Sequence, residues 1–134
     1  MSEHITREQA NELLHKYVKG EKYITHSYAV EAIMRGLAKK LAPDEIEFWG
    51  PSAHCQPIQA ARHHWGICGL LHGLDEETAD WRTDMSTHGP VSAQILKDEG
   101  YDEPVMAQAI CAHNPESGVI AKSTLEIALL AADP

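Results

Sequence analysis

Apolar residues recur along this chain three and four positions apart, and no segment shows the alternation typical of a strand. The spacing predicts helices over residues 7–19, 24–41, 58–73, 90–99, 103–113 and 123–133. The acidic and polar residues 74–87 and the segment 114–122 are expected to be loops. Helices joined by mostly short links predict an all-α fold, a single-domain helical bundle spanning residues 1–134.

Residues that start or stop helices occur at the predicted boundaries. Thr6 with Gln9 and Ser123 with Glu126 each fit a capping box, in which the first residue caps a helix and the second returns a hydrogen bond. Gly73 is a natural C-terminal stop for the helix that precedes it. These signals support the predicted helices, and none of them indicates a boundary between domains.

The composition of the chain, and its net charge above all, limits the kinds of molecule that this protein is expected to bind. The chain has 134 residues, of which 43% are hydrophobic, and eleven basic residues face twenty acidic ones for a formal charge of -9. Such a charge argues against a nucleic acid polymer as partner, although it leaves room for a small phosphate ester. We expect no membrane association, because no apolar run approaches the roughly 20 residues of a membrane helix. A polar N-terminus and three cysteines without a Cys-x-x-Cys pair favour a cytoplasmic location.

Four polar residues fall at the buried faces or ends of predicted helices: His26, His72, His113 and Asp133. Any one of them alone is more often a satisfied core residue or a helix cap than a ligand. Burying a carboxylate beside apolar residues is costly unless it meets a cation. Imidazoles and a carboxylate that converge from separate helices of a bundle can form a divalent-metal site.

Five short segments carry a family resemblance. They are Ile-Thr-His-Ser at 24–27, Trp-Gly-Ile-Cys-Gly-Leu-Leu-His at 65–72, Thr-His-Gly at 87–89, Ala-Ile-Cys-Ala-His-Asn at 109–114 and Ala-Ala-Asp-Pro at 131–134. In this order they resemble the motifs of the HD-domain superfamily, in particular its small single-domain metal-dependent phosphohydrolases. The resemblance runs from Thr6 to Pro134.

The resemblance implies a set of site residues. His26, His72 and Asp133 correspond to ligands of a divalent metal ion, for which Mn, Fe, Mg, Ni and Zn are all candidates. His88 and His113 correspond to groups that bind a second metal or face the phosphate of the substrate. The implied activity is hydrolysis of a phosphorylated small molecule, with nucleotides among the candidates. Whether the protein forms a homo-oligomer is left open.

One departure from the family pattern bears directly on activity. Gly73 stands where the family has the aspartate of its His-Asp doublet, so a ligand is missing. Asp75 is the nearest carboxylate; in a continuous helix it would point away, whereas a turn at Gly73 would bring it inward. We therefore include Asp75, with His88 and His113, among the candidate catalytic residues, and expect weak metal binding and slow hydrolysis. The alternative is a non-catalytic HD-like binding or regulatory module that has lost its metal centre.

A second departure is an apparent insertion at residues 51–64. It contains His54, Cys55, His63 and His64, which raises the question of a zinc site. The spacing fits no standard ligand pattern, so we favour a solvated or helix-extending insert.

Overall fold

The computed structural model describes residues 5–41, 57–77, 84–101 and 103–133. These residues form helices and turns without any strand, which confirms the predicted all-α class. The elements are α1 (Arg7–Tyr17), α2 (Glu21–Leu41), α3 (Pro57–Leu71), α4 (Pro90–Asp98), α5 (Pro104–Ala112) and α6 (Thr124–Ala132), with short 3₁₀ helices η2 (Met85–Thr87) and η3 (Pro115–Ser117).

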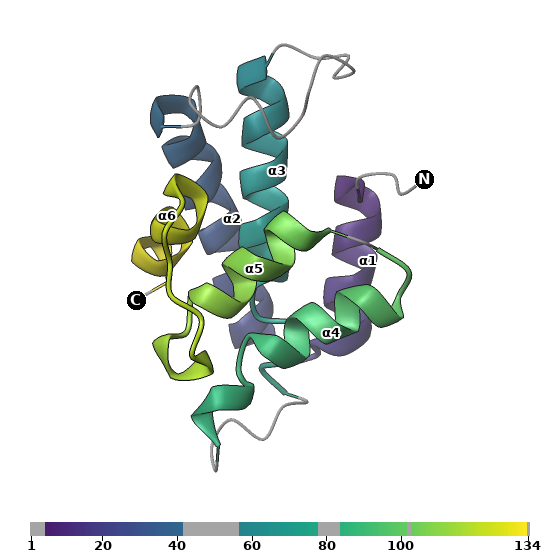
Figure 1. The fold of residues 1–134 in the computed structure, drawn as a ribbon. Coiled ribbons are helices and arrows are strands. Elements are labelled where there is room, and N and C mark those ends of the chain that lie inside the picture. Colours follow the sequence, from purple (N-terminus) through teal and green to yellow (C-terminus); the bar gives the residue numbers. More distant parts are fainter. Residues whose placement is uncertain (1–4, 42–56, 78–83, 102, 134) are drawn as a thin grey trace.

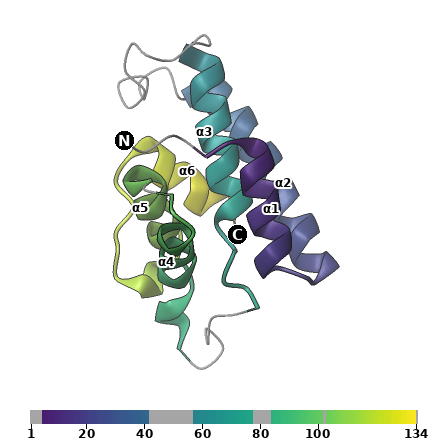
Figure 2. The same ribbon diagram turned by 90° about the vertical axis from the view of Figure 1, so that its right-hand side faces the viewer.

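The six α-helices form two layers that follow the order of the chain (Figures 1 and 2). Helices α1, α2 and α3 make the first layer, in which α3 packs against both α2 and α1. Helices α4, α5 and α6 make the second layer, with α5 in contact with both neighbours. The layers meet where α3 contacts α5 and α6, and where α2 contacts α6. The N-terminal half of the chain therefore faces the C-terminal half across one core.

Most helix boundaries agree with the pattern of the sequence. Both capping boxes form, at Thr6 and at Ser123, and caps of this kind stabilise a helix by about 1 kcal/mol. Helix α2 begins three residues earlier than predicted, because the carbonyl of Gly20 accepts hydrogen bonds from the amides of Tyr23 and Ile24. Helix α3 ends at Leu71 instead of residue 73, and residues 72–77 form turns.

The predicted insertion at residues 51–64 is described only in its second part. Residues 57–64 form the first turns of α3, as expected for an insert that lengthens a helix. Residues 51–56, including His54 and Cys55, lie outside the described residues. His63 hydrogen-bonds to the carbonyl oxygen of Ile5, and His64 is buried.

The core lies between the layers and is made largely of side chains that are fully buried, such as Leu14, Met34, Trp65 and Ile110. Burial of each such side chain contributes about 1.5–3 kcal/mol. Helices α2 and α3 pack closely at Gly69, where an added Cβ would lie 2.9 Å from the carbonyl oxygen of Val30. No helix of the described residues is both long and apolar enough to span a lipid bilayer.

Candidate metal centre

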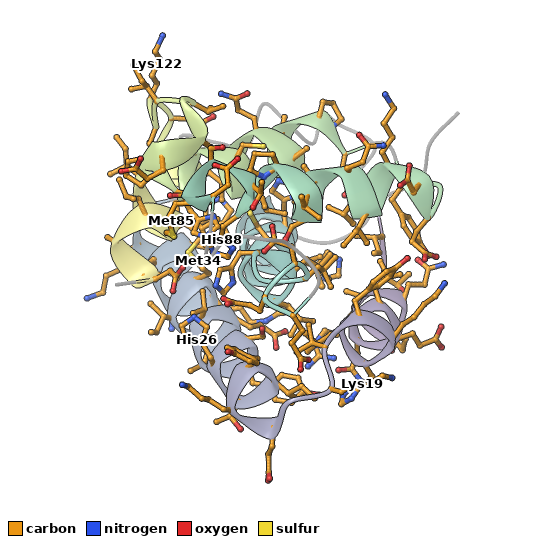
Figure 3. The ribbon with its side chains drawn as sticks, turned by 90° about the horizontal axis from the view of Figure 1, so that it is seen from below. Lys19, His26, Met34, Met85, His88 and Lys122 are labelled. Atoms are coloured by element: carbon orange, nitrogen blue, oxygen red, sulfur yellow. The ribbon has the colours of Figure 1, made fainter. Side chains whose placement is uncertain are left out.

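Five helix ends converge where the two layers meet, and each brings a titratable side chain. His26 comes from the first turns of α2, and His72 directly follows α3. His88 precedes α4, while His113 and Asp133 are the C-terminal caps of α5 and α6. Figure 3 looks onto this end of the bundle, with His26 and His88 labelled. The structure thus brings together the five residues that the sequence singled out from five separate segments.

Asp133 lies at the centre of the cluster. His26 Nε2 is 2.8 Å from Asp133 Oδ1. The other carboxylate oxygen, Oδ2, lies 3.4 Å from His72 Nε2 and 3.3 Å from His113 Nε2. Burial by itself would raise the pKa of Asp133, but the neighbouring imidazoles of His72, His113 and His26 outweigh it and hold the pKa well below its usual range. The carboxylate is therefore anionic at neutral pH.

His72 and His113 are oriented by their own helices. His72 Nδ1 donates to the carbonyl oxygen of Gly69 at 2.5 Å, and His113 Nδ1 donates to that of Ile110. This bond fixes the tautomer and leaves a lone pair on Nε2, which is how histidine ligands are commonly held. Burial and the nearby His72 lower the pKa of His113 to about 4, so its ring is neutral at pH 7.

One ring nitrogen in the cluster lacks a partner that its burial would normally require. His72 is fully buried, and its Nε2 atom makes no hydrogen bond with any described residue. An unsatisfied buried polar atom costs about 1–3 kcal/mol. A divalent cation is the kind of group that this nitrogen and the adjacent Asp133 carboxylate would coordinate.

His88 is positioned by Asp75. His88 Nδ1 donates to Asp75 Oδ1 at 2.7 Å, and His88 Nε2 lies 3.1 Å from His113 Nε2. Burial opposes protonation of His88, but the Asp75 carboxylate outweighs this effect and raises the pKa of the ring. Gly89 follows with φ +103°, a left-handed conformation that turns the chain directly into α4.

The turn after α3 does bring Asp75 inside, although not to the centre of the cluster. Its side chain is fully buried, and its second oxygen accepts hydrogen bonds from the amides of Gly89 at 2.7 Å and Ser92 at 3.2 Å. These amides belong to the N-terminus of α4, where a negative charge is stabilised. Burial raises the pKa of Asp75, but His88 and the two amides outweigh it, so the pKa lies below its usual value. Asp75 therefore orients His88 and does not occupy the place of the missing doublet aspartate.

Glu76 is a residue of the site that the sequence analysis missed. One carboxylate oxygen of Glu76, one ring nitrogen of His26 and one of His72 all lie within 4.8 Å of one another. A second group that meets the same limit is His72, His113 and Asp133. The only signal in the sequence was that Glu76 sits three residues after Gly73 in a segment predicted to be irregular.

A pocket of about 470 Å³ opens onto the cluster. It is lined by Lys22, Tyr23, His26, Glu76, Met85, His88 and Asp133. Its volume is within the range of small-molecule sites in proteins. The cavity is thus bounded by one cationic side chain, by the apolar surfaces of Tyr23 and Met85, and by His26, His88 and Asp133 of the cluster.

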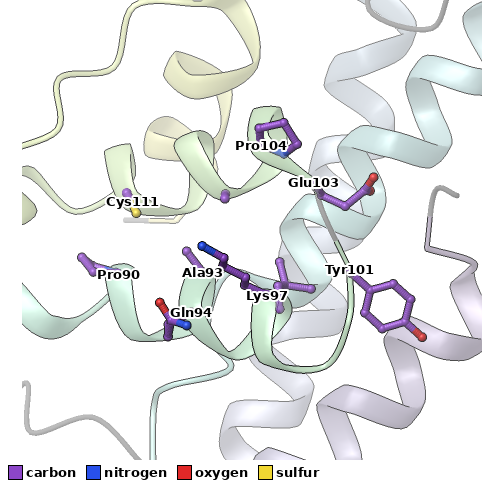
Figure 4. A pocket seen from close by; sticks show the side chains of 10 residues that line it. Pro90, Ala93, Gln94, Lys97, Tyr101, Glu103, Pro104 and Cys111 are labelled. Carbon is purple, nitrogen blue, oxygen red and sulfur yellow. The ribbon is translucent and has the colours of Figure 1, made fainter. Parts of the chain in front are cut away.

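A second pocket, of about 320 Å³, lies between α4 and α5 (Figure 4). Gln94, Lys97, Tyr101 and Cys111 are among the residues that line it. None of its lining residues is a histidine or belongs to the cluster described above. It is therefore separate from the candidate metal centre.

Comparison with models of protein families identifies the family of this chain. The model of the HD domain family matches residues 23–133, which is most of the chain. Searches of curated proteins and of solved structures found no significant match. The matched segment contains every residue of the cluster, from His26 on α2 to Asp133 after α6.

Proposed function

This chain belongs to the HD-domain family, a family of metal-dependent phosphohydrolases, and on that basis we propose that it hydrolyses a phosphorylated small molecule with a divalent cation held by His26, His72 and Asp133. The observation that carries the proposal is the buried His72 Nε2, which has no hydrogen bond among the described residues and faces an anionic carboxylate. When bound, a divalent cation supplies Lewis acidity toward a phosphoryl oxygen and lowers the pKa of water.

The remaining histidines are suited to act on the phosphate. His88 faces the pocket, and the Asp75 carboxylate raises the pKa of its ring, which favours the form that donates an N–H to a phosphoryl oxygen. His113 is neutral and presents Nε2 toward both His88 and Asp133. Proton transfer by a positioned histidine typically accelerates a reaction by a factor of about 10²–10⁴.

The pocket walls suggest a substrate with a flat apolar part. Lys22 contributes a cationic group that attracts a phosphate to a protein of otherwise negative charge. Tyr23 and Met85 offer the surfaces on which a nucleobase would pack. Nucleoside monophosphates are therefore the first compounds to assay.

The test is phosphate release by protein purified without added metal and then supplied with Mn²⁺, Fe²⁺, Mg²⁺, Ni²⁺ or Zn²⁺ in separate reactions. The substrates are p-nitrophenyl phosphate and a panel of nucleoside and sugar monophosphates. We expect metal-dependent release that is lost in the variant Asp133→Asn. Gly73 is the feature that favours the alternative, a non-catalytic HD-like module. Metal binding without release from any substrate would overturn the proposed activity, and the absence of both metal binding and release would support that alternative.

A further inference from the structure

The turn after α3 sends three consecutive acidic side chains in three directions. Asp75 points to α4, where it binds His88 and the amides of Gly89 and Ser92. Glu77 points to the link between α1 and α2, where its carboxylate accepts hydrogen bonds from backbone amides. Glu76 points to the pocket and the histidine cluster. Of the three, only Glu76 has its carboxylate next to the ring nitrogens of His26 and His72.

Glu76 reaches the cluster by crossing over Gly73. The amide of Glu76 donates to the carbonyl oxygen of Gly73 at 3.1 Å, which closes a tight turn and stacks position 76 above position 73. A Cβ added at Gly73 would lie 3.0 Å from Cγ and 3.3 Å from Oε1 of Glu76. The Glu76 side chain therefore occupies the space into which any side chain at position 73 would have to grow.

We infer that Glu76 supplies the metal-binding carboxylate that Gly73 lacks. The ligand expected from position 73 thus comes from position 76 in this protein. This inference rests on the proposed function, because it needs the same metal site. The site then has two carboxylates, Asp133 and Glu76, instead of one. Gly73 on this view does not mark a lost metal centre; it is what allows the Glu76 side chain to lie against the backbone there.

The position of Glu76 agrees with this role. Its side chain is half-buried and lines the pocket. One of its carboxylate oxygens lies within 4.8 Å of a ring nitrogen of His26 and of one of His72, so the three groups could hold one divalent ion.

The experiment measures binding of Mn²⁺ itself to metal-depleted protein by electron paramagnetic resonance, with circular dichroism and thermal melting to show that each variant is folded. Glu76→Gln keeps the size of the side chain and removes its charge. Since loss of even an outer-shell partner typically weakens metal binding about 10–100-fold, we expect Glu76→Gln to weaken Mn²⁺ binding at least that much. Glu77→Gln is the matched control, and its Mn²⁺ affinity should equal that of the unmodified protein.

A rescue variant makes the test specific. In Glu76→Ala, which empties that space, the added change Gly73→Asp should restore most of the Mn²⁺ affinity that Glu76→Ala loses, because it returns a carboxylate to the same place. Gly73→Asp in the unmodified protein should gain little, since Glu76 already fills the position. Gly73 has no positive φ, so the substitution carries no left-handed strain.

The outcomes separate this inference from the proposed function. If Asp133→Asn abolishes Mn²⁺ binding while Glu76→Gln binds as the unmodified protein does, the metal site stands and the role of Glu76 is refuted. The role of Glu76 is also refuted if Glu76→Ala loses Mn²⁺ binding and the added Gly73→Asp does not restore it. If the unmodified protein binds none of the metals, both the proposed function and this inference fail.

Discussion

Asp75 joins the turn after α3 to the start of α4, and replacing it by alanine should weaken the fold measurably. The substitution removes the acceptor for three donors: His88 Nδ1 at 2.7 Å, the amide of Gly89 at 2.7 Å and the amide of Ser92 at 3.2 Å. Each buried donor left unsatisfied costs about 1–3 kcal/mol. Part of the His88 ring reaches solvent, so water can satisfy some of its hydrogen bonding. We therefore expect the costs of the three lost bonds to add to about 3–5 kcal/mol in the free energy of unfolding, near the low end of their combined range.

Asparagine at the same position separates the structural role from the chemical one. Both backbone amides bond to a single oxygen, Oδ2, so an amide oxygen placed there keeps both bonds. The amide nitrogen would then face His88 Nδ1 and donate to it, which moves the ring proton to Nε2. We therefore expect Asp75→Asn to cost only about 1–2 kcal/mol of stability while the His88 tautomer is reversed.

Urea unfolding in the presence of a chelator measures the stability of both variants, and long-range ¹H–¹⁵N correlation spectra report the His88 tautomer. Asp84→Ala is the control, because Asp84 is an exposed cap of η2 whose loss should cost no more than about 1 kcal/mol. A cost below about 1 kcal/mol for Asp75→Ala, or equal costs for alanine and asparagine, would refute this account of Asp75.

Two further predictions concern helix packing and acid stability. Gly69→Ala should destabilise the protein by about 1–3 kcal/mol because the new Cβ would meet the backbone of α2 at 2.9 Å, whereas Gly36→Ala, with nothing within 4 Å, should stabilise it by about 0.5–1 kcal/mol. Thermal and urea unfolding of both variants decide this, and equal effects would contradict it. Glu99 accepts hydrogen bonds from Lys16 and Tyr17, which lower its pKa. The contribution of Glu99 to the free energy of unfolding is therefore present above its unfolded pKa of about 4.3, and it is lost as the pH falls through the lower pKa of the folded state. The stability difference between the unmodified protein and Glu99→Gln should thus shrink between pH 7 and pH 3, and a difference independent of pH would argue against it.

The helices were predictable because their signals are local. Capping boxes at Thr6 and Ser123 depend on residues only three positions apart, and the apolar stripes need nothing beyond helical spacing. The family resemblance added His88 to the candidates, although its own segment carries no apolar stripe. The few errors, such as the early start of α2, arise from backbone hydrogen bonds at helix ends that spacing does not reveal.

The sequence by itself determined the helical class, the identity of the chemical groups and their attachment to helix ends. Only the tertiary structure decided which acidic residue of the turn at 75–77 faces the cluster. Once the chain leaves α3 at Leu71, no helical period assigns a face to Asp75, Glu76 or Glu77. Their directions depend on partners distant in the chain: the N-terminus of α4 for Asp75, the link before α2 for Glu77, and His26 of α2 for Glu76.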